Sequence, residues 1–188
     1  MARALALALP GIVLAVAGTT HPMVLDAASA HHWWTMHVWL LPVFPLLAVA
    51  LFVLLRGEHG PLAWLARVAA YGYAVFYTGL DVLSGIAAGL VFDVQGERTP
   101  SVDRLLALGN ELGEVGRWAW LAAAVLAAAA LLRRDGRAVA PGAVILVVGA
   151  VPFVLDHIYA PWGVMGVAVT AVGLAVLELA GGRQAQAA

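Results

Sequence analysis

The chain has 188 residues, of which 63% are hydrophobic and 11% charged, with a formal net charge of −1. Soluble domains average about a quarter charged residues, so this composition predicts an all-α, polytopic membrane protein with no separate soluble domain. The absence of cysteine excludes disulfides, thiolate metal sites and Cys-attached haem. All ten basic residues are arginines, which excludes a retinal Schiff base and lysine-based covalent chemistry. No basic run suits nucleic acid.

Apolar stretches separated by polar turns predict a single integral membrane domain, residues 1–188, with about six transmembrane helices. The predicted spans are about 4–20, 33–55, 62–92, 104–132, 140–159 and 164–180. The first span also fits a secretory signal peptide, because it follows a positive charge and ends in small residues. Its length, near the spanning range, favours a retained helix. The third span exceeds one bilayer thickness, so it is expected to tilt or to project beyond the membrane.

The arginines predict the orientation, because positive residues concentrate on the cytoplasmic side of membrane proteins. With six spans and a cytoplasmic N-terminus, most of the ten arginines fall on or near that side. These are Arg3, Arg56, Arg67, Arg133, Arg134, Arg137 and Arg183. The sequence therefore predicts a multi-pass protein of the cell inner membrane with both termini in the cytoplasm.

Ionisable residues from different spans are expected at one depth. Counted at about 1.5 Å per residue from the arginine-flanked turns, Asp81, Glu114 and the Asp156-His157 pair lie on the order of 21–28 Å from the cytoplasmic end. His37 lies within the first turns of its span, near the outer interface. Charged groups inside a membrane are costly and need a reason. This shared depth predicts a pocket in the outer leaflet that faces the extracytoplasmic side.

The stretch 109–117 supplies one wall of the predicted pocket. Asn110, Glu114 and Arg117 are spaced to share one helix face. Gly109 and Gly113 follow the small-xxx-small pattern that lets a second helix approach. The residues predicted to line the ligand pocket are Asp81, Asn110, Glu111, Glu114, Arg117, Asp156 and Tyr159. The predicted metal ligands are His37, Asp81, Glu114 and His157.

Imidazole and carboxylate groups together suit a transition-metal ion, and the predicted pocket also suits another cationic ligand. A haem is a second reading, with His37 and His157 or Met36 as axial ligands. A metal-activated water would make the protein a membrane-embedded, metal-dependent enzyme. However, spaced motifs such as His-Glu-x-x-His are absent, and the sequence identifies no catalytic residue.

Two other functions remain open at this stage. An acid cluster open to one side also suits a small cation- or proton-coupled transporter. Alternatively, the cluster fixes helix packing in an accessory subunit, which would act as a homo-oligomer or within a membrane complex. In every case the expected partners are the lipid bilayer and a small ligand or ion. The remaining histidines near this end, His21, His31 and His32, are predicted to be solvated loop residues.

Overall fold

The computed structural model describes residues 1–187 of the chain, with side chains placed through residue 181. Over these residues every regular element is helical, which confirms the predicted all-α class. The elements are α1 (Ala2–Gly18), α2 (Ala30–Leu40), α3 (Val43–Leu54), α4 (Pro61–Leu80), the π-helical segment η1 (Asp81–Ala87), α5 (Ala88–Gln95), α6 (Pro100–Asp135), the 3-10 turn η2 (Gly136–Val139), α7 (Ala140–Asp156) and α8 (Trp162–Ala187).

Four helical stretches are long and apolar enough to cross a membrane, and they support the membrane assignment. They are Ala30–Leu54, Pro61–Gln95, Pro100–Asp156 and Trp162–Gly181. The third stretch contains two helices, α6 and α7, which pack against each other after the chain reverses at η2. The apolar helix α1 is shorter than these four stretches.

Prolines mark several of the helix boundaries. Pro61 and Pro100 open α4 and α6 at their first helical positions, where the missing N–H costs no hydrogen bond. The predicted span 33–55 is divided into α2 and α3, with Pro42 at the N-cap of α3. Because proline cannot donate an intrahelical hydrogen bond, it interrupts the helix there.

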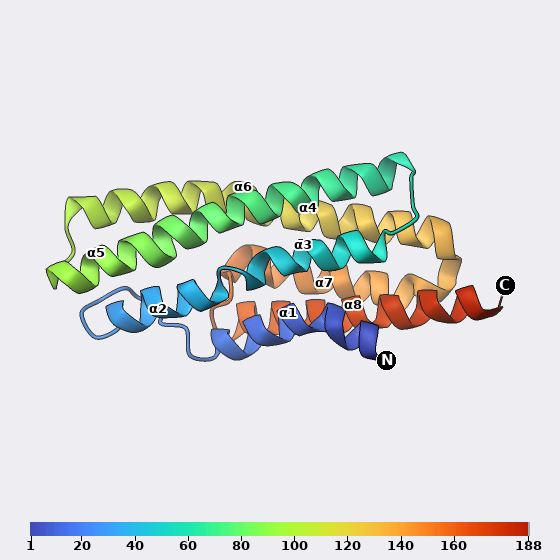
Figure 1. Ribbon diagram of the computed structural model, residues 1–188, viewed down its shortest axis with the longest axis horizontal. Coiled ribbons are helices and arrows are strands. Elements are labelled where there is room, and N and C mark those ends of the chain that lie inside the picture. Colours follow the sequence, from blue (N-terminus) through green and yellow to red (C-terminus); the bar gives the residue numbers. More distant parts are fainter. Residues whose placement is uncertain (188) are drawn as a thin grey trace.

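The helices form two regions with separate apolar cores. The larger region, called the bundle here, combines α1, α3, α4, α7, α8 and the C-terminal half of α6 around buried residues such as Leu51, Tyr73 and Trp120. The smaller region, called the projection, consists of α2, α5 and the start of α6 and extends beyond the ends of α1 and α7 (Figure 1). Its core is formed by Leu25, Ala30, Trp33, Ala88, Phe92 and Val102.

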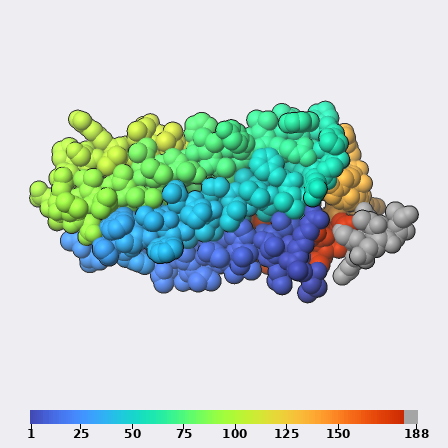
Figure 2. All heavy atoms as spheres, viewed as in Figure 1, coloured from blue at the N-terminus to red at the C-terminus, as the bar shows by residue number. Residues whose placement is uncertain are grey.

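Both chain ends lie at the end of the bundle that is remote from the projection (Figure 1). The space-filling view in Figure 2 shows the first half of the chain, α1 to α5, closing over one face of the molecule without a break between bundle and projection. The site described below lies inside, where the two regions meet.

Close helix packing within the bundle gives a first testable expectation. A Cβ added to Gly149 of α7 would lie 2.5 Å from the backbone nitrogen of Thr170 in α8, so the two helices would have to separate. Gly149→Ala is therefore expected to destabilise the protein by about 1–3 kcal/mol, measured as a lower unfolding temperature in detergent. The matched control is Gly72→Ala, because a Cβ there meets nothing closer than 3.7 Å. Equal stability of the two variants would contradict this packing.

Candidate functional site

Three histidines from separate parts of the chain meet between the bundle and the projection. His21 follows the end of α1, His37 lies in the last turn of α2, and His157 caps the end of α7. One ring nitrogen from each lies within 4.8 Å of the others. The Nε2 atoms of His21 and His37 are 3.4 Å apart. His21 and His37 are both buried, and His157 is partly buried.

The backbone at His157 is shaped to aim its ring inward. His157 has φ 54° and is the one non-glycine residue with positive φ in the described part of the chain. Such a conformation costs on the order of 1–3 kcal/mol and is typical of functional sites. It ends α7 abruptly, and the ring packs between Phe44 and Tyr77, with centroid distances of 5.6 and 5.5 Å. The local strain thus places an imidazole at the end of the bundle.

Hydrogen bonds fix the orientation of the imidazoles. Nδ1 of His21 donates to the carbonyl oxygen of Pro22 at 2.7 Å, and Nδ1 of His37 donates to that of Trp33 at 2.6 Å. A carbonyl oxygen only accepts, so Nδ1 carries the hydrogen and Nε2 of each neutral ring presents a lone pair. Nδ1 of His157 is hydrogen-bonded to the Tyr77 hydroxyl. Two Nε2 lone pairs therefore face each other, an arrangement that favours a cation between them.

The charge state of His21 fits this arrangement. Burial, together with the neighbouring His37, lowers the pKa of His21 to about 4. The ring is therefore neutral near pH 7 and keeps the Nε2 lone pair. Neutral imidazole is the form that binds metal ions.

A buried carboxylate lies beside the histidines without a hydrogen-bond partner. Asp81 is 1% exposed, and neither of its carboxylate oxygens has a hydrogen-bond partner among the residues that the structure describes. Its Oδ1 lies 3.8 Å from Nε2 of His37. Because an isolated buried charge is very costly, such a group is normally protonated, paired or close to a bound cation.

The π-helical segment η1 places Asp81 and the residues that follow it. Its wider turn buries Asp81, Ser84 and Gly85 together, and π-helical turns are frequent at functional sites. Gly85 allows a close approach of α2, since any Cβ there would overlap the imidazole of His37. Ser84 donates to the carbonyl oxygen of Leu106 at 2.9 Å and so ties η1 to α6.

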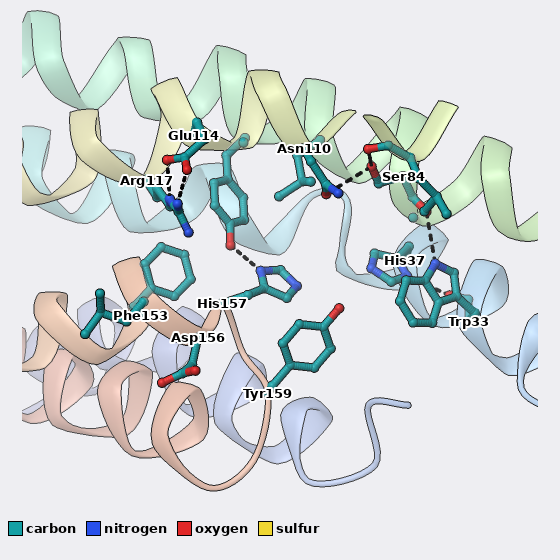
Figure 3. A pocket seen from close by; sticks show the side chains of 16 residues that line it. Trp33, His37, Ser84, Asn110, Glu114, Arg117, Phe153, Asp156, His157 and Tyr159 are labelled. Carbon is teal, nitrogen blue, oxygen red and sulfur yellow. Dashed lines mark hydrogen bonds and ion pairs between the residues drawn. The ribbon is translucent and has the colours of Figure 1, made fainter. Parts of the chain in front are cut away.

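A pocket of about 360 Å³ opens beside the imidazoles (Figure 3). Its walls come from α2, α4, η1, α6, α7 and the segment after α7. The polar lining residues are His37, Tyr77, Ser84, Asn110, Glu114, Arg117, Asp156, His157 and Tyr159. Aromatic and aliphatic side chains, among them Trp33, Leu80 and Phe153, complete the lining.

The residues predicted from the sequence occupy different places around this pocket. Asn110, Glu114, Arg117, Asp156 and Tyr159 line it. Asp81 lies behind it, next to His37. Glu111, by contrast, is exposed and is not among the lining residues.

Glu114, predicted as a metal ligand, is engaged by an arginine in this structure. Nε of Arg117 donates to Oε2 of Glu114 at 2.7 Å, and a second guanidinium nitrogen bonds Oε1. Nη1 of Arg117 donates to the carbonyl oxygen of Val154 at 3.0 Å, which connects α6 to α7. The Glu114–Arg117 pair thus forms one rim of the pocket.

The sequence interpretation missed His21. The prediction of a solvated loop residue is wrong for His21, which is 6% exposed, whereas His31 and His32 are exposed as expected. His21 follows the outer end of the first helix, at the depth expected for His37 and His157. Extending the depth argument by one turn beyond that helix would have included it.

In comparisons with known proteins, no family model, no curated protein and no solved structure matches this chain.

Proposed function

We propose that this protein is a six-span inner-membrane protein that binds one divalent transition-metal ion, foremost Zn²⁺, at the extracytoplasmic end of its bundle. The observation that carries the proposal is the convergence of His21, His37 and His157, each with one ring nitrogen within 4.8 Å of the others. Asp81 supplies a negative charge beside them.

The membrane arrangement is inferred from the helices and the arginines. Counting α6 and α7 separately and adding α1 to the apolar stretches gives six crossings. Both chain ends then lie at one end of the bundle (Figure 1). The α3–α4 turn and the α6–α7 connection, from the last turn of α6 through η2, hold Arg56, Arg133, Arg134 and Arg137. The site histidines belong to α2, the end of α7 and the segment after α1. Since arginines mark the cytoplasmic side, the site faces the extracytoplasmic side.

The distance between two of the imidazoles suits a tetrahedral ion. Zinc binds imidazole nitrogen at about 2.0–2.1 Å, so two tetrahedral ligands stand roughly 3.3–3.4 Å apart. The Nε2 atoms of His21 and His37 are separated by 3.4 Å. Metal-binding histidines usually donate their second ring N–H to a carbonyl or carboxylate, which fixes the ring. His21 and His37 do so through Pro22 and Trp33.

The alternatives fit these contacts less well. Two axial histidines must leave a free plane for a porphyrin, but His21 lies 3.4 Å from the Nε2 of His37. A transporter needs a path inward, whereas Tyr73, Tyr77 and Trp120 pack behind the site as fully buried side chains. A purely structural polar network would pair its carboxylates, and Asp81 has no hydrogen-bond partner.

Metal titration of the purified protein tests this function. Chelator-treated protein in detergent is expected to bind one equivalent of Zn²⁺, measured by elemental analysis after desalting. Binding at a hundred times Kd should stabilise the fold by about 2.7 kcal/mol, seen as a higher unfolding temperature. His157→Ala should bind much less metal, and His59→Ala, in the α3–α4 turn, is the control. A wild-type protein that binds none of Zn²⁺, Mn²⁺, Fe²⁺ or Cu²⁺ would refute the proposal.

A further inference from the structure

The pocket beside the imidazoles has a lateral mouth. Its deep walls are formed by buried residues, among them Trp33, Ser84 and Phe153. The exposed lining residues are Asn110 and Glu114 on α6 and Leu155 on α7. The pocket therefore opens sideways between α6 and α7, which form the upper and lower walls in Figure 3. A ligand can enter from the membrane side of the bundle.

The surface below this mouth is apolar. Trp118 lies one helical turn from Glu114 towards the cytoplasmic end, and Val151 lies one turn from Leu155 in the same direction, so each continues its helix face. Trp118, Val151 and Leu155 are 55%, 44% and 66% exposed. At the mouth itself, Asn110, Glu114 and Asp156 are polar. A molecule with a polar head and an aliphatic chain matches a polar mouth with an apolar surface below it.

Three imidazole ligands would leave one position of a tetrahedral ion for a water molecule. Three protein ligands and one open position are typical of catalytic zinc, whereas structural zinc has four protein ligands. Within 4.0 Å, in the described part of the chain, Asp81 approaches His37 alone among the three histidines. This position suits a carboxylate that accepts a hydrogen bond from a metal-bound water, and it suits direct ligation less well. His37 and His157 line the pocket, so the open position faces it.

We propose that this protein hydrolyses the acyl ester or amide bond of a single-chain membrane amphiphile that enters between α6 and α7. The inference rests on the metal site proposed above. The acyl chain lies along Trp118, Val151 and Leu155, and the scissile carbonyl lies beside His37 and His157. The polar leaving group faces Asn110 and Asp156.

The reaction balances with water as its sole co-reactant. A metal ion held by His21, His37 and His157 would lower the pKa of a water molecule bound to it. In the hydrolysis, water adds to the carbonyl carbon, a carbon–oxygen bond forms, and the ester C–O or amide C–N bond breaks. One proton of the water ends on the leaving oxygen or nitrogen. Asp81, beside His37, would orient the water through a hydrogen bond. The products are a carboxylic acid and an alcohol or amine, and no electrons are transferred. At neutral pH the acid ionises and gives its proton to solvent or to the amine product.

Hydrolysis of chromogenic probes by the Zn²⁺-loaded protein tests the inference. The probes are p-nitrophenyl octanoate, p-nitrophenyl acetate and N-octanoyl p-nitroaniline, added to protein in lipid nanodiscs. Wild type is expected to cleave an octanoyl probe, and to prefer octanoate over acetate at least about tenfold in kcat/KM, because the longer chain buries more apolar surface. At saturating Zn²⁺, Asp81→Asn should retain metal and lose about a hundredfold in rate.

A neighbouring pair of substitutions separates pocket binding from general esterase chemistry of zinc. Asn110→Trp should fill the mouth and reduce octanoate hydrolysis at least tenfold at unchanged Zn²⁺ content. Glu111→Trp is the matched control, since Glu111 is exposed and lies outside the pocket lining. Metal-loaded protein that cleaves neither octanoyl probe overturns this inference and leaves the metal site standing. Equal loss in the two tryptophan variants also overturns it. Failure to bind metal refutes the metal site, and the inference with it.

Discussion

His21→Ala is expected to lower the affinity for Zn²⁺ by at least about a hundredfold, although His21 lies in a loop. Loss of outer-sphere partners alone typically costs 10–100-fold in metal affinity, and removal of a ligand should exceed that. His21 is one of three imidazoles, and its Nε2 lies 3.4 Å from that of His37. Competition with a chromogenic chelator measures the change in affinity.

His31→Ala is the matched control for that loss. His31 belongs to the same end of the chain, but it is exposed and its Nδ1 is 3.0 Å from Oδ2 of Asp93. Its replacement should leave Zn²⁺ affinity within about twofold. If His21→Ala and His31→Ala bind Zn²⁺ equally well, His21 is not a ligand and the three-imidazole site is wrong.

The depth of polar residues was readable from the sequence. Composition predicted helices, and counting residues from the arginine turns predicted that His37, Asp81 and His157 would lie at one level. In the structure a ring nitrogen of His37 lies within 4.8 Å of one of His157, and Nε2 of His37 lies 3.8 Å from Oδ1 of Asp81. Position along a helix axis can be estimated from the sequence because the rise per residue is fixed, so an error of a few residues in a helix end shifts that position by about one turn.

Features that depend on irregular backbone could not be predicted in the same way. The π-helical turn at Asp81–Ala87 changes the helix face on which Asp81 and Ser84 lie, and no residue pattern predicts this turn. The positive φ of His157 arises from tertiary packing, since histidine has no intrinsic need for that conformation. His21 lies outside any helix, so helical periodicity gave no reason to place it in the site.

Asp81→Asn is expected to stabilise the metal-free protein and to destabilise the Zn²⁺-bound protein. Without metal, the carboxylate is buried and lacks hydrogen bonds within the described residues, so a neutral amide of the same size, which brings no charge to bury, should stabilise the protein. With Zn²⁺, the carboxylate offsets the positive charge, so the gain from metal should shrink, together with a 10–100-fold loss of affinity. The unfolding temperatures of wild type and Asp81→Asn, each measured with and without Zn²⁺, test for these opposite shifts.

The control for these opposite shifts is Asp103→Asn, because Asp103 is an exposed carboxylate paired with Arg98 at 2.6 Å. Surface pairs contribute about 0–1 kcal/mol, so both metal states should change little and in the same direction. Metal-free Asp81→Asn that unfolds at a lower temperature than wild type would show that the carboxylate stabilises the fold by itself. Asp81 would then have a structural role, and its position beside the imidazoles would not indicate a bound cation. Opposite shifts in the two states require that Asp81 and a bound cation act on each other, which packing alone does not produce.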